Sequence, residues 1–166
     1  VSSSSTSAPQ EGAGRAYDVI IVGGGLSGLV AARSILERRP DTTICILEAQ
    51  NRIGGRVQAT TPKSTEPLTG GVETGAAWIF KGLNPRMEKL VAEFGLDLVQ
   101  QRELHEDGST DSVNSIARVR RGEHVRVKQG LHAVIGKLVS ELSKTTPCDI
   151  LTNHPVKQIS HIDGSA

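Results

Sequence analysis

Aromatic side chains are scarce in this sequence of 166 residues, which has one Trp, one Tyr and two Phe. So few rings exclude a substrate cage built of aromatic side chains from this chain alone. No apolar run approaches the ~18 residues that a membrane-spanning helix needs. The formal net charge of +1 gives no reason to expect a nucleic-acid partner.

Residues with the spacing of metal ligands are also lacking. The two cysteines, Cys45 and Cys148, are far apart in the sequence, and the five histidines follow no ligand pattern. We therefore predict no metal site and two free thiols, with Cys45 in a strand and Cys148 in a loop after Pro147.

What the sequence does contain is a glycine-rich turn between a predicted strand and a predicted helix. Residues 18–22 form a short β-branched run, typical of a strand that is buried on both faces. The run Gly-Gly-Gly-Leu-Ser-Gly follows at 23–28, and apolar residues then recur at helical spacing until Pro40. This setting is typical of dinucleotide-binding sites.

Each glycine of this turn has a distinct physical role. Gly23 permits a sharp turn, Gly25 lets the backbone approach a pyrophosphate, and Gly28 lets the helix pack closely. Leu26 and Ser27 lie at the helix N-terminus, where unpaired N–H groups and the helix dipole favour an anion. A glycine turn that binds nothing is the alternative, and the surrounding strand and helix argue against it.

An acidic residue ends the second predicted strand, residues 43–48. Glu48 lies at its C-terminal end, where a carboxylate can accept hydrogen bonds from ribose hydroxyls, and Ala49 comes next. We expect Glu48 to bind the ribose and not to support the core. The fold class predicted is α/β, a Rossmann-like domain with a parallel sheet.

A second glycine pair, Gly54-Gly55, followed by Arg56, indicates which dinucleotide is bound. These glycines permit close backbone approach, and Arg56 has a planar cation suited to phosphate. A nicotinamide dehydrogenase needs no such second site. The pattern therefore favours FAD, with a plain turn as the alternative.

These motifs, together with Glu-Thr-Gly-Ala-Ala-Trp-Ile at 73–79, resemble the flavin-containing amine oxidases. The Gly-Ala-Ala-Trp-Ile sequence is closer to the polyamine-type members than to the vertebrate monoamine type. The resemblance implies that the Gly-Gly-Arg run lies along the FAD pyrophosphate and that 75–78 border the isoalloxazine ring. Trp78 could equally be a core anchor. It also implies that Val156 presents its backbone to the adenine, although a plain strand residue would fit there too. The expected cofactor-binding residues are Gly23, Gly25, Leu26, Ser27, Gly28, Glu48, Ala49, Gly55, Arg56, Gly75, Ala76, Ala77, Trp78 and Val156.

The sequence also predicts how the chain is organised. Residues 1–16 read as a flexible tail without the apolar core of a signal peptide, and a first residue other than Met suggests processing. Residues 17–97 are expected to form the first FAD-binding part. A shortened, solvated linker at 98–128 stands in place of the family's substrate domain, and a helix and strands follow at 129–166. Further helices are predicted after Pro85 up to Gly95 and at 131–142, with strands at 150–151 and 156–162.

Because complete family members are much longer, we expect an FAD domain that is incomplete relative to the full family fold. No catalytic residue is carried over, and a missing C-terminal portion or partner chain is expected to be needed for turnover. The resemblance implies oxidation of the C–N bond of a small amine, a monoamine, polyamine or L-amino acid, with O2 as acceptor. The alternatives are a non-catalytic nucleotide-binding or interaction module, and a relative of the flavin desaturases or protoporphyrinogen oxidase.

Overall fold

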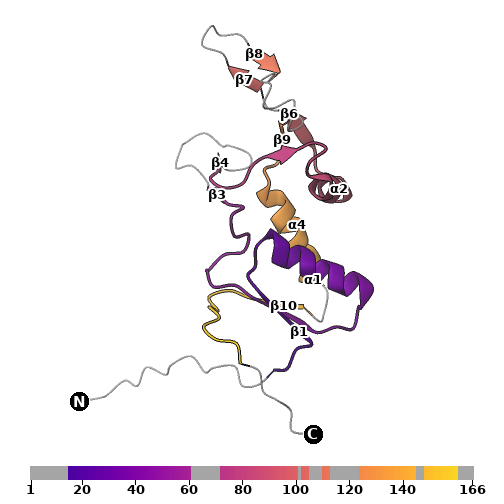
Figure 1. The fold of residues 1–166 in the computed structure, drawn as a ribbon, viewed down its shortest axis with the longest axis vertical. Helices are drawn as coiled ribbons and strands as arrows, with labels where there is room; N and C mark the ends of the chain where they lie inside the picture. Colours follow the sequence, from indigo (N-terminus) through magenta and orange to yellow (C-terminus); the bar gives the residue numbers. More distant parts are fainter. Residues whose placement is uncertain are drawn as a thin grey trace, which may run out of the picture.

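The computed structural model describes residues 15–60, 72–100, 102–104, 110–112, 124–144 and 148–160. It has an α/β fold in which a parallel sheet lies beneath two helices, with short antiparallel strands beyond them (Figure 1). In these ranges, no helix is both long and apolar enough to cross a membrane.

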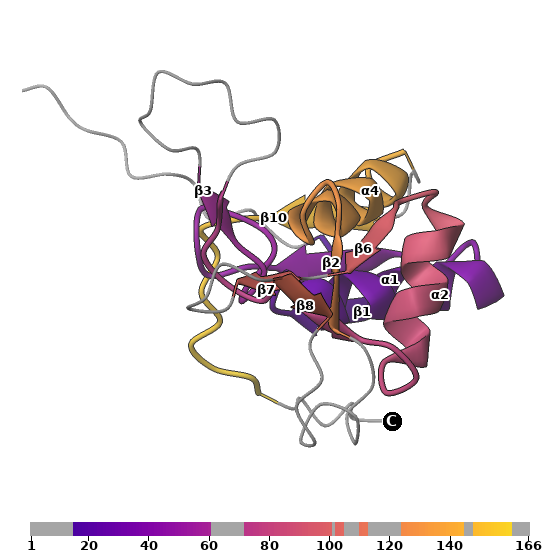
Figure 2. The same ribbon diagram turned by 90° about the horizontal axis from the view of Figure 1, so that it is seen from above.

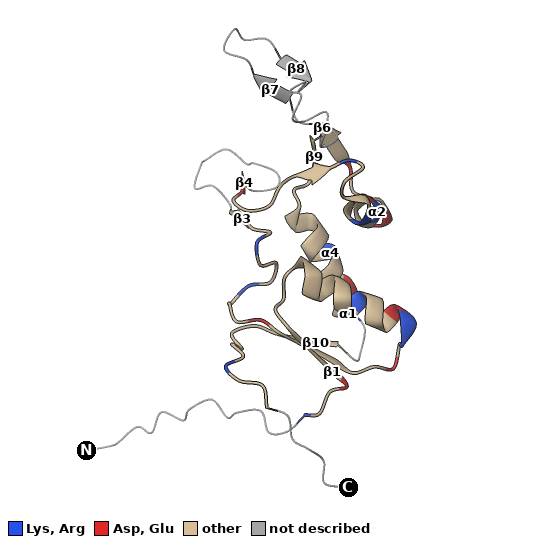
Figure 3. Cartoon of the chain, in the orientation of Figure 1, with Lys and Arg blue, Asp and Glu red and all other residues tan. Residues whose placement is uncertain are grey.

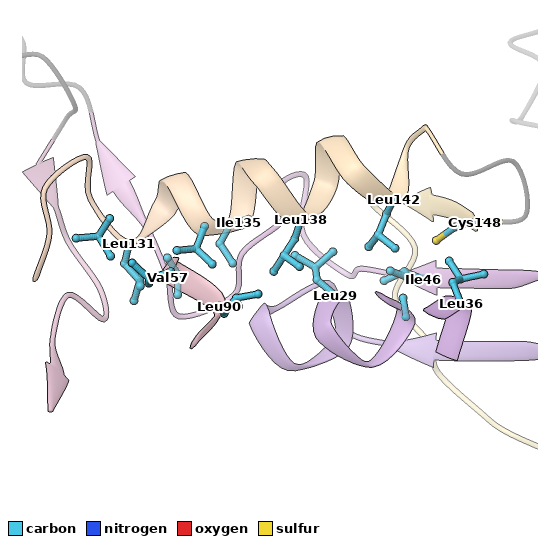
Figure 4. Packing of buried hydrophobic residues seen from close by; sticks show 14 of the residues in the cluster. Leu29, Leu36, Ile46, Val57, Leu90, Leu131, Ile135, Leu138, Leu142 and Cys148 are labelled. Atoms are coloured by element: carbon cyan, nitrogen blue, oxygen red, sulfur yellow. The ribbon is translucent and has the colours of Figure 1, made fainter. Parts of the chain in front are cut away.

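The parallel sheet has three strands in the order β1-β2-β10. These strands are β1 (Val19–Val22), β2 (Ile44–Leu47) and β10 (Cys148–Leu151), and β2 pairs in parallel with both neighbours. Helix α1 (Leu26–Arg38) joins β1 to β2 and packs against α4 (His132–Leu142). Apolar side chains of α1, α4 and β2 meet between the helices and the sheet (Figure 4).

The two faces of β1 differ in burial. Ile20 and Val22 are 56% and 59% exposed, whereas Val19 and Ile21 pack against the core. The prediction of a strand buried on both faces is therefore wrong for the described structure. The helices cover one face, and no described segment covers Ile20 and Val22.

A second sheet lies beyond the N-terminal end of α4, in the order β5-β9-β6. Its antiparallel strands are β5 (Ile79–Phe80), β9 (His124–Val127) and β6 (Leu98–Gln100). Helix α2 (Pro85–Glu93) connects β5 to this sheet's other edge. Two further strand pairs are β3 (Ala59–Thr60) with β4 (Val72–Glu73), and β7 (Arg102–Leu104) with β8 (Thr110–Ser112). In Figure 2, α4 lies to one side of α1, and α2 crosses in front of α1.

The segment expected to be a solvated linker contributes strands to the fold. Its described parts form β6, β7, β8 and β9, and Val125 and Val127 of β9 are buried. Burial alternates from residue to residue along β9, as in a strand with one buried face. The mixed charge of the segment hid this pattern in the sequence. How the whole chain divides into domains stays a prediction, and residues 1–14 of the expected tail lie outside the described residues.

Two local predictions near the C-terminal end are wrong. Cys148 begins β10 and is buried, instead of lying in a loop, because its strand pairs with Ile44 at the start of β2. Residues 152–160 form no strand, and Val156 and Ile159 are exposed, while 161–166 lie outside the described residues. Both cysteines are free thiols, as predicted.

Candidate dinucleotide-binding site

The turn after β1 leaves the N-terminus of α1 open. Gly23 has φ +104°, a conformation that favours glycine, and its N–H donates to the carbonyl of Leu47 (N···O 2.8 Å). Helix α1 begins after Gly25, and neither a side-chain cap nor an acidic residue occupies its first turn. Its first N–H groups therefore have no intrahelical acceptor and point toward any anion placed there.

Close packing between α1 and this turn requires Gly28. A Cβ at Gly28 would lie 2.1 Å from the carbonyl oxygen of Gly23, closer than any real contact. The absence of a side chain lets the first turn of α1 rest directly on the backbone that leaves β1. Helix packing therefore explains why position 28, the last glycine of the motif, has no side chain.

The second glycine pair packs against the first turn, although the two are distant in sequence. The N–H of Gly54 donates to the carbonyl of Gly24 (N···O 2.9 Å), and Gly25 and Gly54 form a parallel bridge. A Cβ at Gly55 would lie 3.3 Å from the Cα of Gly25. Both Gly54 and Gly55 have positive φ. Arg56 comes next and is exposed, and no described residue pairs with its guanidinium.

The Gly-Ala-Ala-Trp segment lies along the backbone of residues 56–58. Ala76 donates to the carbonyl of Arg56 (N···O 3.0 Å), and a Cβ at Gly75 would lie 2.0 Å from that same oxygen. Backbone crowding by Arg56 is therefore sufficient to explain Gly75. Ala77 is buried, whereas Trp78 is 44% exposed and does not anchor the core.

These three segments surround a cavity of about 550 Å³, a size typical of sites for small molecules and cofactors. Many of the predicted residues line it, namely Gly23, Gly25, Leu26, Ser27, Gly28, Gly55, Arg56, Ala76 and Trp78. Other lining residues were not singled out from the sequence, among them Asn84, Met87 and Leu131. Met87 and Leu131 belong to apolar stripes of predicted helices, and such stripes predict burial in the core. Nothing in the sequence therefore indicated that these two residues line the cavity.

Glu48 lies outside this cavity and has a structural role that the sequence analysis did not expect. The residue is 8% exposed, and its carboxylate accepts hydrogen bonds from the N–H groups of Gln50 and Gly24 (both N···O 2.8 Å). These bonds, first that from Gln50 and then that from Gly24, lower the pKa of Glu48 below its ordinary range. Glu48 therefore supports the turn after β1 through these two bonds, and its binding to the ribose stays a prediction. Two backbone bonds still leave acceptor capacity on a carboxylate.

Val156 and Ala49 also lie away from the cavity, near Glu48. The N–H of His154 donates to the carbonyl of Glu48 (N···O 2.8 Å), and that of Asn153 donates to Gln50 (N···O 2.9 Å). These bonds place the exposed Val156 segment beside the end of β2. The predicted site residues thus follow one path, from Val156 and Glu48 past the start of α1 to Trp78.

Several of the described charges outside the cavity form ion pairs. Basic and acidic residues occur on both α1 and α2 (Figure 3), and Arg33 of α1 forms ion pairs with Glu37, Glu93 of α2 and Glu141 of α4. Arg126 is paired with Glu73. Arg56 is thus the cation that faces the cavity without a described counter-ion, which suits an anionic ligand.

A family model described as flavin containing amine oxidoreductase matches residues 26–116, more than half of the chain. The chain belongs to this family. Its members are oxidoreductases, and FAD is their cofactor. The matched region includes the start of α1, the second glycine pair and the Gly-Ala-Ala-Trp segment.

Similar proteins include oxidases of amines. The chain is 34% identical to the human (Homo sapiens) peroxisomal N(1)-acetyl-spermine/spermidine oxidase, over 66% of this chain and 22% of that protein. It is 36% identical to flavin-containing amine oxidase A of Equus caballus, over 51% of this chain and 15% of that protein. The chain thus spans less than a quarter of the length of either relative.

A solved structure from Exiguobacterium sp. 255-15, named as a proposed protoporphyrinogen oxidase, shares the fold. The TM-score is 0.64 at 16% identity, and the match covers 88% of this chain and 54% of that one. This likeness supports the assignment of a Rossmann-like domain that represents part of a larger fold.

Proposed function

We propose that this chain forms the FAD-binding part of an FAD-dependent amine oxidoreductase. One observation carries the proposal. An open helix N-terminus, a second glycine pair and an unpaired arginine all face the same cavity. Backbone N–H groups and a guanidinium are the donors that a pyrophosphate prefers.

The residues along the path fit the parts of FAD in order. We place the adenosine at the Val156 and Glu48 end, where the carboxylate has acceptor capacity left for a ribose hydroxyl. The pyrophosphate then lies at the start of α1 beside Arg56, and the isoalloxazine ring lies at Ala76 and Trp78. Glycines along this path leave the backbone accessible, and the exposed indole offers an apolar wall.

When bound, FAD supplies two-electron redox chemistry, here oxidation of the C–N bond of a small amine with O2 as electron acceptor. The residues of this chain hold and orient the cofactor. Glycine backbone and Arg56 fix the phosphates, and Trp78 limits access of water to one side of the site. No described residue is proposed as catalytic, and we propose that further chain is needed to hold the amine.

Binding is tested by titrating FAD and NADP separately into the full chain. Trp78 is the single tryptophan, so quenching of its emission reports a flavin at the cavity. We expect saturable quenching by FAD and much weaker binding of NADP, because the Glu48 carboxylate repels a 2′-phosphate. Tighter binding of NADP would contradict the proposal.

The variant Arg56→Gln tests the phosphate contact. A lost charge-assisted hydrogen bond costs about 1.5–3 kcal/mol, so FAD affinity should fall roughly 10- to 100-fold. The matched control is Arg38→Gln, which removes the same charge from the far end of α1 and should leave FAD affinity unchanged. Equal effects of the two substitutions would show that only net charge matters.

Amine oxidation is tested separately, with FAD-loaded protein and a panel of monoamines, polyamines and L-amino acids. We expect no peroxide from this chain alone, and amine-dependent peroxide once the remaining family domains are supplied. FAD binding without turnover in that longer form would favour the alternative, a nucleotide-binding module. Turnover by this chain alone would show that it already builds a substrate site.

A further inference from the structure

A buried carboxylate joins three elements next to the cavity. The side chain of Glu73, at the end of β4, is 4% exposed. It accepts hydrogen bonds from the Nη2 atom of Arg126 on β9 (2.6 Å) and from the N–H of Leu131, which precedes α4. A buried charge is tolerated when it is paired and hydrogen-bonded, and here both conditions are met.

Arg126 in turn contacts the tryptophan of the cavity wall. Its guanidinium carbon lies 5.7 Å from the centroid of the Trp78 ring, within the range of a cation–π contact. The ring of His124 lies 5.9 Å from the same indole. Trp78 is half exposed, so these two contacts, and not burial in the core, restrict where its ring can lie.

Both residues held by this arrangement line the cavity. Leu131 and Trp78 line the cavity, whereas Glu73 and Arg126 contact these two residues and are not among the lining residues. Loss of the carboxylate would release Arg126 and the backbone before α4 at the same time. One acidic side chain is thus linked to two parts of the cavity wall, directly to Leu131 and through Arg126 to Trp78.

We propose that Glu73 and Arg126 are positioning residues for the cofactor cavity, with Glu73 holding Arg126 and Arg126 holding the Trp78 ring beside the flavin. The inference rests on the proposed function, because it assigns the flavin end of FAD to Trp78. It deepens that function by adding two residues that do not contact the cofactor. It also predicts a consequence in the free protein, where no cofactor is needed.

A purely stabilising role for this ion pair is the competing explanation, and the chain offers a matched control for it. Arg33 also pairs with a glutamate, Glu93 (2.8 Å), and also lies over an aromatic ring, that of Phe94 (5.5 Å). Arg33 does not line the cavity. Arg33→Lys and Arg126→Lys therefore remove the same kind of guanidinium–ring contact while keeping the positive charge.

The experiment compares the wild-type chain, Arg126→Lys, Arg33→Lys and Glu73→Gln. Two properties are measured, the quenching of Trp78 emission by acrylamide in the free protein and the Kd for FAD. Urea unfolding of each variant provides the stability against which both are judged. The circular dichroism of bound flavin reports whether its surroundings have changed.

We expect Arg126→Lys to raise the acrylamide quenching of Trp78 and to weaken FAD binding by roughly two- to fivefold, the size of a lost cation–π contact. Glu73→Gln should have a larger effect in the same direction and change the flavin signal, since it loosens Leu131 as well. Arg33→Lys should lower stability without changing either property of the cavity.

Two different failures can be told apart. If the wild-type chain binds no FAD, the proposed function fails and the inference fails with it. If the wild-type chain binds FAD but Arg126→Lys and Glu73→Gln match Arg33→Lys in both cavity properties, only the inference is overturned. If Glu73→Gln does not fold, Arg126→Lys alone decides, because it keeps the buried carboxylate paired with a cation.

Discussion

Substitution of Glu48 should destabilise the fold as well as weaken FAD binding. The carboxylate is buried and accepts the N–H groups of Gly24 and Gln50, so it joins the turn after β1 to the chain that leaves β2. In Glu48→Ala, both donors lose their acceptor. Glu48→Gln keeps the volume and one acceptor oxygen, but its amide nitrogen cannot accept the second bond.

The magnitude follows from the number of donors left unpaired. A buried donor without a partner costs about 1–3 kcal/mol. The bond from Gly24 is buried and that from Gln50 is only partly buried, so Glu48→Ala should lower the free energy of unfolding by roughly 2–5 kcal/mol, somewhat less than twice the single cost. Glu48→Gln should cost roughly 1–3 kcal/mol, because one bond survives. Glu48→Ala also removes the proposed acceptor for the ribose, which should weaken FAD binding by about 1.5–3 kcal/mol in addition.

The pH dependence gives a second, independent check. The pKa of Glu48 is lowered in the folded state from its ordinary value of 4.5, so the carboxylate stabilises the fold fully above about that pH. This stabilisation is lost as the pH falls further, through the depressed folded pKa. The stability gap between wild type and Glu48→Gln should therefore be constant near neutral pH and narrow under acidic conditions.

Urea unfolding at several pH values measures the stability, and FAD titration of the folded variants measures affinity. If Glu48→Ala weakened FAD binding while leaving the free energy of unfolding unchanged, the buried hydrogen bonds would contribute nothing and our account would be refuted. A stability gap independent of pH down to strongly acidic conditions would refute the pKa argument alone.

Two further predictions concern the stability of the fold. Thermal unfolding should show that Gly28→Ala destabilises the fold by about 1–3 kcal/mol or more, because its Cβ would overlap the carbonyl of Gly23. In the same assay Gly136→Ala in α4, where a Cβ meets nothing, should be neutral or slightly stabilising. Arg33→Ala should lower stability by roughly 1 kcal/mol, because it removes the ion pairs that join α1 to α2 and α4. Since Arg33 lowers the pKa of Glu93, that loss should shrink as the pH falls below the range of an ordinary glutamate, and unfolding curves at neutral and acidic pH check this.

Local patterns in the sequence were enough to predict the elements that carry the site. A β-branched run, a glycine turn and a helical apolar stripe predict β1, the turn and α1, because each depends on residues that are neighbours along the chain. The same reasoning predicts β2, α2 and α4, close to the bounds that the structure has. The second glycine pair pointed to FAD for the same local reason.

Tertiary structure decided how those elements pack and which of their side chains become buried or paired. Whether β1 is covered on one face or two depends on which segments pack on it, and a sequence period of two cannot specify that. Glu48 matched its motif, yet its two backbone donors come into reach only when the turn after β1 folds back on the end of β2. Glu73 and Arg126 meet because the folded chain brings their side chains together, although β4 and β9 belong to different sheets, are far apart in the sequence and have no motif to link them. Chain neighbours determine which elements form, whereas contacts between distant residues determine which side chains become buried and paired.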